Sequence, residues 1–115
     1  MDHFDIPLFK KSYDLYKTLY GYRLAVPKLD RYGIWQKTEN TLLEVIEHVL
    51  LASQKAKQEK ISHLEQASSS LNLLRVFIRL MKDTKALDMK KYLILEVAIE
   101  EIGRMLGGWI KSTKE

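Results

Sequence analysis

The side chains best suited to chemistry in this sequence are lysines and arginines at helical spacing. Arg75, Arg79 and Lys82 recur at steps of four and three residues, which places them on one face of a helix, and Lys85 follows just beyond. A second set lies in the N-terminal segment against a single acid, Asp14. This set consists of Lys10, Lys11, Lys17 and Arg23. Cations gathered in this way attract phosphate groups, and such binding weakens steeply with added salt because counterions are released.

Three interpretations of these cations are open from the sequence. A nucleic acid or an acidic protein surface would bind them, whereas cations that only solvate two helices need no partner. We expect the two cationic segments to lie side by side and to face outward, so that their side chains merge into one basic patch. Nucleic acid and an acidic protein would then compete for the same surface.

A run of glycines beside a tryptophan is the second unusual feature. Gly103, Gly107 and Gly108 interrupt a strongly patterned helical segment that also contains Leu106 and Trp109. Each glycine in a helix interior costs about 1 kcal/mol relative to alanine. Close approach of another backbone would offset that cost, and Trp109 supplies a large apolar anchor. We expect a packing contact here, inside the fold or between subunits; the alternative is that Gly107 and Gly108 end the helix early.

Patterns that would indicate catalysis or metal binding are absent from the sequence. No Glu-x-x-His motif occurs for a di-iron centre, and Glu44 and Glu47 fall on a polar face with His48 one position out of place. The three histidines, which include His3 and His63, are far apart in the sequence and are expected to be solvated or lightly packed. Cysteine is missing, as are Gly-rich phosphate loops and the Gly-x-Ser-x-Gly motif. We therefore predict no catalytic residue, no metal and no cofactor.

Composition limits the size and the environment of the fold. The 115 residues suffice for one domain, 1–115, and 46% hydrophobic with 30% charged residues is typical of a globular protein. No run approaches about 18 uncharged apolar residues, so we expect no membrane span. The first residues, Met-Asp-His-Phe-Asp, lack the apolar core of a signal peptide, which predicts a cytoplasmic protein.

Four segments carry apolar residues at helical spacing. They are predicted near 7–24, 35–56, 60–83 and 89–111. Asp5 before Pro7, and Asp88, provide capping side chains for the first and last helices. We place a polar turn between the second and third segments, because one helix of about 50 residues would be about 75 Å long without a heptad pattern to hold it. Four amphipathic helices with short connectors predict an all-α, antiparallel up-down four-helix bundle.

Three motifs resemble the Avd family, the accessory variability determinants of diversity-generating retroelements. Residues 101–110, EIGRMLGGWI, resemble its C-terminal signature, and residues 74–80, LRVFIRL, resemble its third-helix motif. Val-Pro-Lys at 26–28 with Arg-Tyr-Gly at 31–33 is similar to the link between its first two helices. Together the motifs extend over most of the chain.

The resemblance implies a pentameric, barrel-like ring of bundles with a positively charged exterior. It implies partners as well: the retroelement reverse transcriptase, and RNA or DNA that includes template-derived RNA. Such a protein is not itself the polymerase but is needed for mutagenic synthesis of complementary DNA, in the cytoplasm of a bacterium or from a phage gene. Arg75 and Arg79 match the arginines of the third-helix motif, and 103–109 match the C-terminal one.

A sister group offers the alternative function. The four-helix proteins encoded in intervening sequences of bacterial 23S ribosomal RNA genes share the connector pattern, and such a protein would associate with ribosomal RNA or the ribosome. Their second helix usually opens with a Ser-Ile-Pro-Ala-Asn-Ile-Ala-Glu-Gly-like motif. Residues 41–48 of this chain read TLLEVIEH instead, which favours the Avd family.

Overall fold

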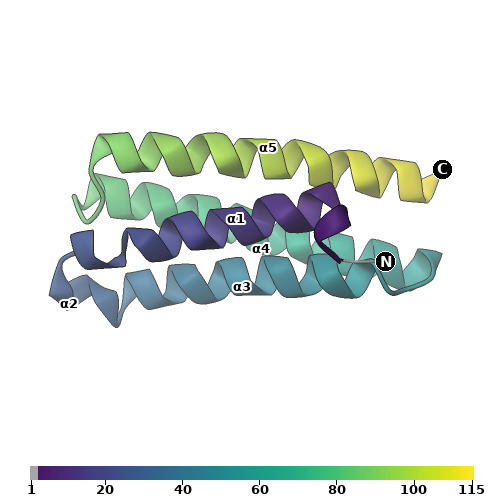
Figure 1. The fold of residues 1–115 in the computed structure, drawn as a ribbon, viewed down its shortest axis with the longest axis horizontal. Coiled ribbons are helices and arrows are strands. Elements are labelled where there is room, and N and C mark those ends of the chain that lie inside the picture. Colours follow the sequence, from purple (N-terminus) through teal and green to yellow (C-terminus); the bar gives the residue numbers. More distant parts are fainter. Residues whose placement is uncertain (1–2) are drawn as a thin grey trace.

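A computed structural model describes residues 3–115 of the chain. They fold as an antiparallel four-helix bundle that is about as long as its longest helix. Its longest dimension is 44 Å (Figure 1). The elements in chain order are η1 (His3–Asp5), α1 (Pro7–Gly21), η2 (Arg23–Ala25), α2 (Lys28–Arg31), α3 (Ile34–Ala52), α4 (Lys57–Asp83) and α5 (Met89–Lys114). The predicted all-α bundle is confirmed. Within the described residues, no helix has the length and apolar character that a membrane crossing requires.

Each long helix packs against the long helices next to it in the chain, and the first and last of them also pack against each other. The helix α1 contacts α3 and α5, and α4 contacts the same two helices, so that α1 and α4 lie diagonally across the bundle. Figure 1 accordingly shows α1 in front and α4 behind it. The core between them is filled by fully buried side chains from all four helices, among them Leu19, Trp35, Leu74 and Leu95. Burial of these apolar stripes is the main term that stabilises the bundle.

The helix boundaries follow the predictions closely, with shifts that have local causes. The break between the second and third segments is confirmed, but its predicted position after residue 56 is wrong. The helix α3 ends at Ala52, where the Ser53 hydroxyl donates a 2.6 Å hydrogen bond to the Leu50 carbonyl, and α4 already begins at Lys57. The first helix ends at Gly21 rather than at 24, because the chain tightens into η2 before Pro27. The last helix continues past 111 to Lys114.

The two predicted caps have different outcomes. Asp88 caps α5, since its Oδ1 accepts a 2.8 Å hydrogen bond from the backbone N–H of Lys91. The prediction for Asp5 is wrong: Asp5 lies in η1, and Ile6 occupies the position before α1 with no side-chain cap. Pro7 at the start of α1 needs no hydrogen-bond partner for its nitrogen, which makes a cap there less necessary.

Replacement of the confirmed cap tests this assignment. We expect Asp88→Ala to lower the melting temperature by several degrees, because one backbone N–H of α5 loses its acceptor. The same hydrogen bond is the main reason that the pKa of Asp88 lies below its ordinary value of 3.8, and a hydrogen bond from the Lys91 ammonium is the second. The carboxylate therefore stabilises the fold above pH 3.8, and the deficit of the variant should shrink as the pH falls through the lowered pKa.

Asp5→Ala is the matched control for thermal unfolding followed by circular dichroism. It removes a carboxylate near a helix start that forms no cap, so its melting temperature should equal that of the wild type. Equal losses in the two variants would contradict the capping assignment.

Candidate interaction surface

The cations of α1 and α4 do not form one surface, because the two helices are diagonal neighbours. The prediction that they lie side by side is wrong. In an up-down bundle with short connectors, the first helix is adjacent to the second and the fourth, and the third is opposite to it. The three lysines of α1 therefore lie on a different face of the molecule from the cations of α4, whereas Arg23 lies beyond α1, in η2.

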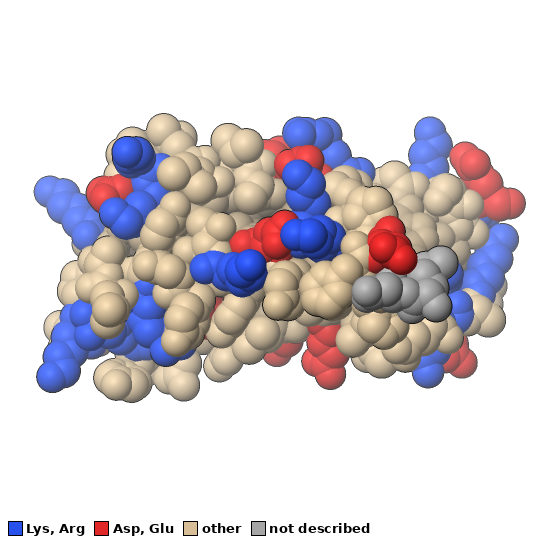
Figure 2. Space-filling model, viewed as in Figure 1, with Lys and Arg blue, Asp and Glu red and all other residues tan. Residues whose placement is uncertain are grey.

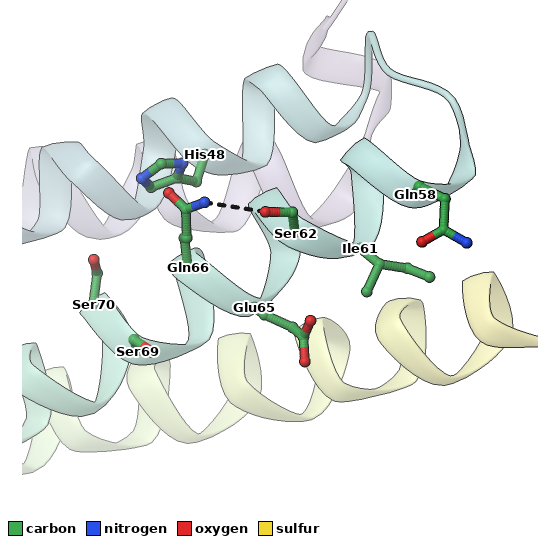
Figure 3. Close-up of a pocket in the computed structure, with 8 residues that line it drawn as sticks. All are labelled: His48, Gln58, Ile61, Ser62, Glu65, Gln66, Ser69 and Ser70. Carbon is green, nitrogen blue, oxygen red and sulfur yellow. Dashed lines mark hydrogen bonds between the residues drawn. The ribbon is translucent and has the colours of Figure 1, made fainter.

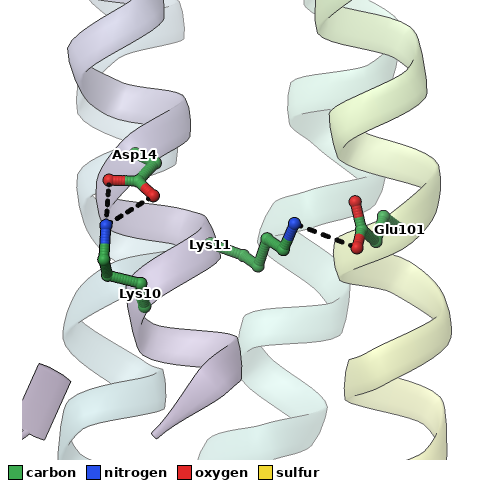
Figure 4. Close-up of polar contacts among 4 residues, drawn as sticks. All are labelled: Lys10, Lys11, Asp14 and Glu101. Carbon is green, nitrogen blue, oxygen red and sulfur yellow. Dashed lines mark hydrogen bonds and ion pairs between the residues drawn. The ribbon is translucent and has the colours of Figure 1, made fainter. Parts of the chain in front are cut away.

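Most cations on α1 are neutralised by acids within the fold. The Lys10 ammonium lies 2.8 Å from Asp14 Oδ2, and the Lys11 ammonium lies 3.1 Å from Glu101 Oε1 of α5 (Figure 4). The hydrogen bond from Lys10 lowers the pKa of Asp14 from its ordinary value. Lys17 has no acid within 4 Å in residues 3–115 and lies 5.8 Å from the centre of the Tyr13 ring. A phosphate that approached Lys10 or Lys11 would have to compete with these carboxylates.

The cations on α4 are also engaged. Arg75 Nη1 lies 3.4 Å from Glu100 Oε1 of α5, and the Lys82 ammonium lies 3.3 Å from Asp83 and 4.9 Å from the centre of the Tyr92 ring. Arg79 is exposed and reaches Asp83 only at 3.9 Å. Such exposed pairs contribute little to stability, so Arg79 can exchange its partner at small cost, whereas Arg75 packs between α4 and α5.

The positive charge of the molecule is instead concentrated at one end of the bundle. We define the basic end as residues 22–37 and 79–91, which bring together the connector around α2 and the turn between α4 and α5 (left in Figure 1). It contains nine lysines and arginines against three acids, whereas the rest of the chain contains ten and twelve. The whole positive excess of the protein therefore lies at this end, where Figure 2 shows several Lys and Arg side chains on the left of the face in view.

Several cations of the basic end face solvent without an acidic partner. Among residues 3–115, no carboxylate lies within 4.0 Å of the side-chain nitrogens of four exposed lysines. These lysines are Lys28, Lys37, Lys85 and Lys90. The backbone of Lys85 has a positive φ of 66°, and this residue lies in the turn after α4. Of the predicted cations, Arg23, Arg79, Lys82 and Lys85 belong to the basic end, and Lys10, Lys11, Lys17 and Arg75 lie outside it.

A partly buried ion pair fixes the connector of the basic end to the core. Arg23 Nη2 lies 2.6 Å from Glu39 Oε1, and the Glu39 side chain on α3 is only 6% exposed. The hydrogen bond that Arg23 donates to Glu39 raises the pKa of Arg23. The pKa of Tyr16 is raised by burial and, second, by the charge of Glu39. Sequence reasoning missed Glu39, although a carboxylate one turn after Trp35 on the apolar stripe of its helix was a usable signal.

The glycines of α5 have two environments. A Cβ on Gly103 would lie 3.3 Å from Arg75 Nη2 and 3.6 Å from Leu71 Cδ2, so Gly103 packs inside the bundle against side chains of α4 and not against the backbone that the sequence predicted. Beside Gly107 and Gly108 a Cβ would meet no atom within 4 Å, and α5 does not end at them. Leu106 belongs to the core and Trp109 packs against it. A contact of Gly107, Gly108 and Trp109 with another copy of the chain stays a prediction.

Two histidines that the sequence separates meet in the structure. The Nδ1 atoms of His48 on α3 and His63 on α4 lie 3.2 Å apart, a contact between helices that the expectation of solvated or lightly packed histidines did not include. His48 also borders an open, polar depression on α4, where Gln66 donates a 3.2 Å hydrogen bond to Ser62 (Figure 3). Within residues 3–115 no group of three or more potential ligands is arranged to hold a metal. The pair is best explained as a hydrogen bond between two helices.

Fold and charge together define a class: a small all-α bundle that presents a basic surface at one end. A family model described as bAvd-like matches residues 8–113, which is nearly the whole chain. The chain belongs to the bAvd-like family, a family of accessory proteins, and the resemblance drawn from the sequence is confirmed. No curated protein sequence matches the chain.

The two environments of the glycines predict opposite responses to alanine. Gly107→Ala should raise the free energy of unfolding by roughly 0.5–1 kcal/mol, because alanine favours the helix and its methyl group meets open space. Gly103→Ala should gain less or lose stability, because its methyl group must displace the Arg75 guanidinium. Urea denaturation of both variants measures the difference, and an equal gain at both positions would contradict the packing described for Gly103.

Proposed function

We propose that this chain is a non-enzymatic accessory protein of a diversity-generating retroelement. It binds the reverse transcriptase and nucleic acid, either template RNA or complementary DNA, and supports mutagenic synthesis of complementary DNA. The observation that carries this proposal is the concentration of the whole positive excess at one end of the bundle. Membership of the bAvd-like family supports the retroelement context.

The basic end suits a polyanion because four of its six lysines have no carboxylate within 4.0 Å to give up, whereas Lys82 and Lys91 are paired with Asp83 and Asp88. A phosphate that binds Lys28 or Lys85 displaces only counterions and water, which is the favourable term in such binding. A phosphate that binds Lys10 must also disrupt the ion pair with Asp14, at 2.8 Å. Arg23 and Arg31 add planar guanidinium groups, which form forked hydrogen bonds with phosphates and stack on bases. The main site of binding is therefore the basic end rather than the middle of α1.

Assembly of several copies strengthens this mechanism. The resemblance implies a pentamer, and exposed apolar side chains on α4 and α5 support contacts between copies. They are Leu73, Val76, Leu80, Met89, Leu93 and Val97. A ring of five copies repeats the basic end, so that weak contacts with phosphates add up to avidity when one nucleic acid reaches several subunits.

Charge removal at two locations tests the proposal. Lys28→Gln, Lys85→Gln and Lys90→Gln together should weaken binding of single-stranded template RNA at least about tenfold. They should also reduce the slope of log affinity against log salt by about 2, since each lost phosphate contact on a single strand contributes about 0.7. Fluorescence anisotropy of labelled RNA over a range of KCl concentrations gives both values.

The matched control removes three lysines from α1. Lys10→Gln, Lys11→Gln and Lys17→Gln change the net charge by the same amount, but two of these lysines are already neutralised by Asp14 and Glu101. This variant should bind RNA within about threefold of the wild type. Stronger loss in the control than in the triple variant of the basic end would overturn the assignment of the surface.

A further inference from the structure

The basic end also contains the most exposed large hydrophobic side chains of residues 3–115. Leu29 is 92% exposed, Tyr32 82% and Leu24 81%, whereas the next most exposed, Val97 on α5, reaches 67%. Single exposed apolar residues are normal on a protein surface. Three within nine residues of one connector, surrounded by cations, are the arrangement expected of a binding surface.

This connector is held in one shape by hydrogen bonds and by a buried anchor. Arg31 Nε donates to the Val26 carbonyl and Arg31 Nη2 donates to the Leu24 carbonyl, each at 3.1 Å. The Val26 side chain is 1% exposed and joins the core. The ion pair of Arg23 with buried Glu39 fixes the start of the connector to α3. Leu24 and Leu29 are therefore presented by an ordered backbone, which lowers the entropy lost when a partner binds.

A recess beside the connector adds polar groups to the surface. It has a volume of about 270 Å³, and its lining includes Arg23, Arg31 and Tyr32. Gln36 and Asn40 of α3 contribute amides to the same recess. Arginine and tyrosine are the residue types enriched in the energetic centres of protein interfaces.

We propose that residues 24–32 form a docking site for an acidic protein surface that contains apolar pockets. Leu24 and Leu29 insert into the pockets of the partner, while Lys28 and Arg31 contact its carboxylates. Charge complementarity favours an acidic partner, because the basic end has six more positive than negative charges. The leucines distinguish a protein from a nucleic acid, since bases stack on aromatic rings and guanidinium planes and gain little from aliphatic side chains.

This inference rests on the proposed function for the identity of the partner, which is the polymerase of the retroelement. Within the basic end the roles are then divided. The lysines attract either polyanion, and the two leucines add affinity for the protein alone. A variant that lacks the leucines should therefore separate binding of the protein from binding of RNA.

The test uses the full chain and the purified reverse transcriptase of the retroelement to which the proposed function assigns it. Leu24→Ser with Leu29→Ser should weaken binding to the polymerase at least about tenfold, as expected for loss of interface anchors. Affinity for the template RNA alone should stay within about twofold, because no charge changes. Biolayer interferometry at fixed salt measures the first quantity and fluorescence anisotropy the second, with circular dichroism to verify the fold.

Two control variants sharpen the result. Leu43→Ser on α3 removes a 44% exposed leucine outside the basic end and should leave polymerase binding unchanged. Leu24→Met with Leu29→Met keeps the apolar volume and should retain most of the affinity. If the serine variant does not fold, Leu24→Ala with Leu29→Ala replaces it, and wild-type affinity of that variant for the polymerase would overturn the proposal.

The outcomes distinguish this inference from the proposed function. Wild-type polymerase affinity in the serine variant would overturn the docking site and leave the proposed function intact. A parallel loss of RNA affinity would show that the connector binds nucleic acid, which also overturns the docking site. If the wild-type chain binds RNA but not the polymerase, the docking site and the polymerase role fail together.

Discussion

The fold depends on the need of four amphipathic helices to bury their apolar stripes against one another through short connectors. The turns between α3 and α4 and between α4 and α5 are short, so α4 and α5 each reverse direction and pack against the helix before them. This constraint fixes which helices are adjacent, and it places α1 opposite α4. It also gathers the connector around α2 and the turn after α4 at the same end, so that two segments some 50 residues apart in the sequence form one surface.

Pairing within the fold decides which cations can serve a partner. Lys10 and Lys11 are spaced like a binding site, yet each lies about 3 Å from a carboxylate. Lys28 and Lys90 carry the same charge with no such neighbour in the described part of the chain, so their charge is not offset by a nearby carboxylate. The number of basic residues in a helix is therefore a poor guide to the electrostatic potential at its surface, because the nearest acid often comes from another helix.

The same end of the molecule combines charge with exposed apolar side chains on a rigid connector. Side chains on most surface loops are mobile. Here Arg31 binds two carbonyls of the connector and Arg23 ties it to Glu39, so the exposed side chains keep a defined geometry. An accessory protein acts through such surfaces, and the assembly proposed above would present several of them together.

The sequence by itself determined the four helices, the break before α4, the cap at Asp88 and the family, since each depends on residues within a few turns of one another. It also contained the charge balance of the basic end, which is visible only once the two segments are known to meet. The tertiary structure decided the rest. Lys11 with Glu101, Arg23 with Glu39 and His48 with His63 are contacts between helices, and their spacing in the chain says nothing of their distance in space. Periodicity reveals which face of a helix is buried, but only the packing of helices shows which side chains of neighbouring faces neutralise each other.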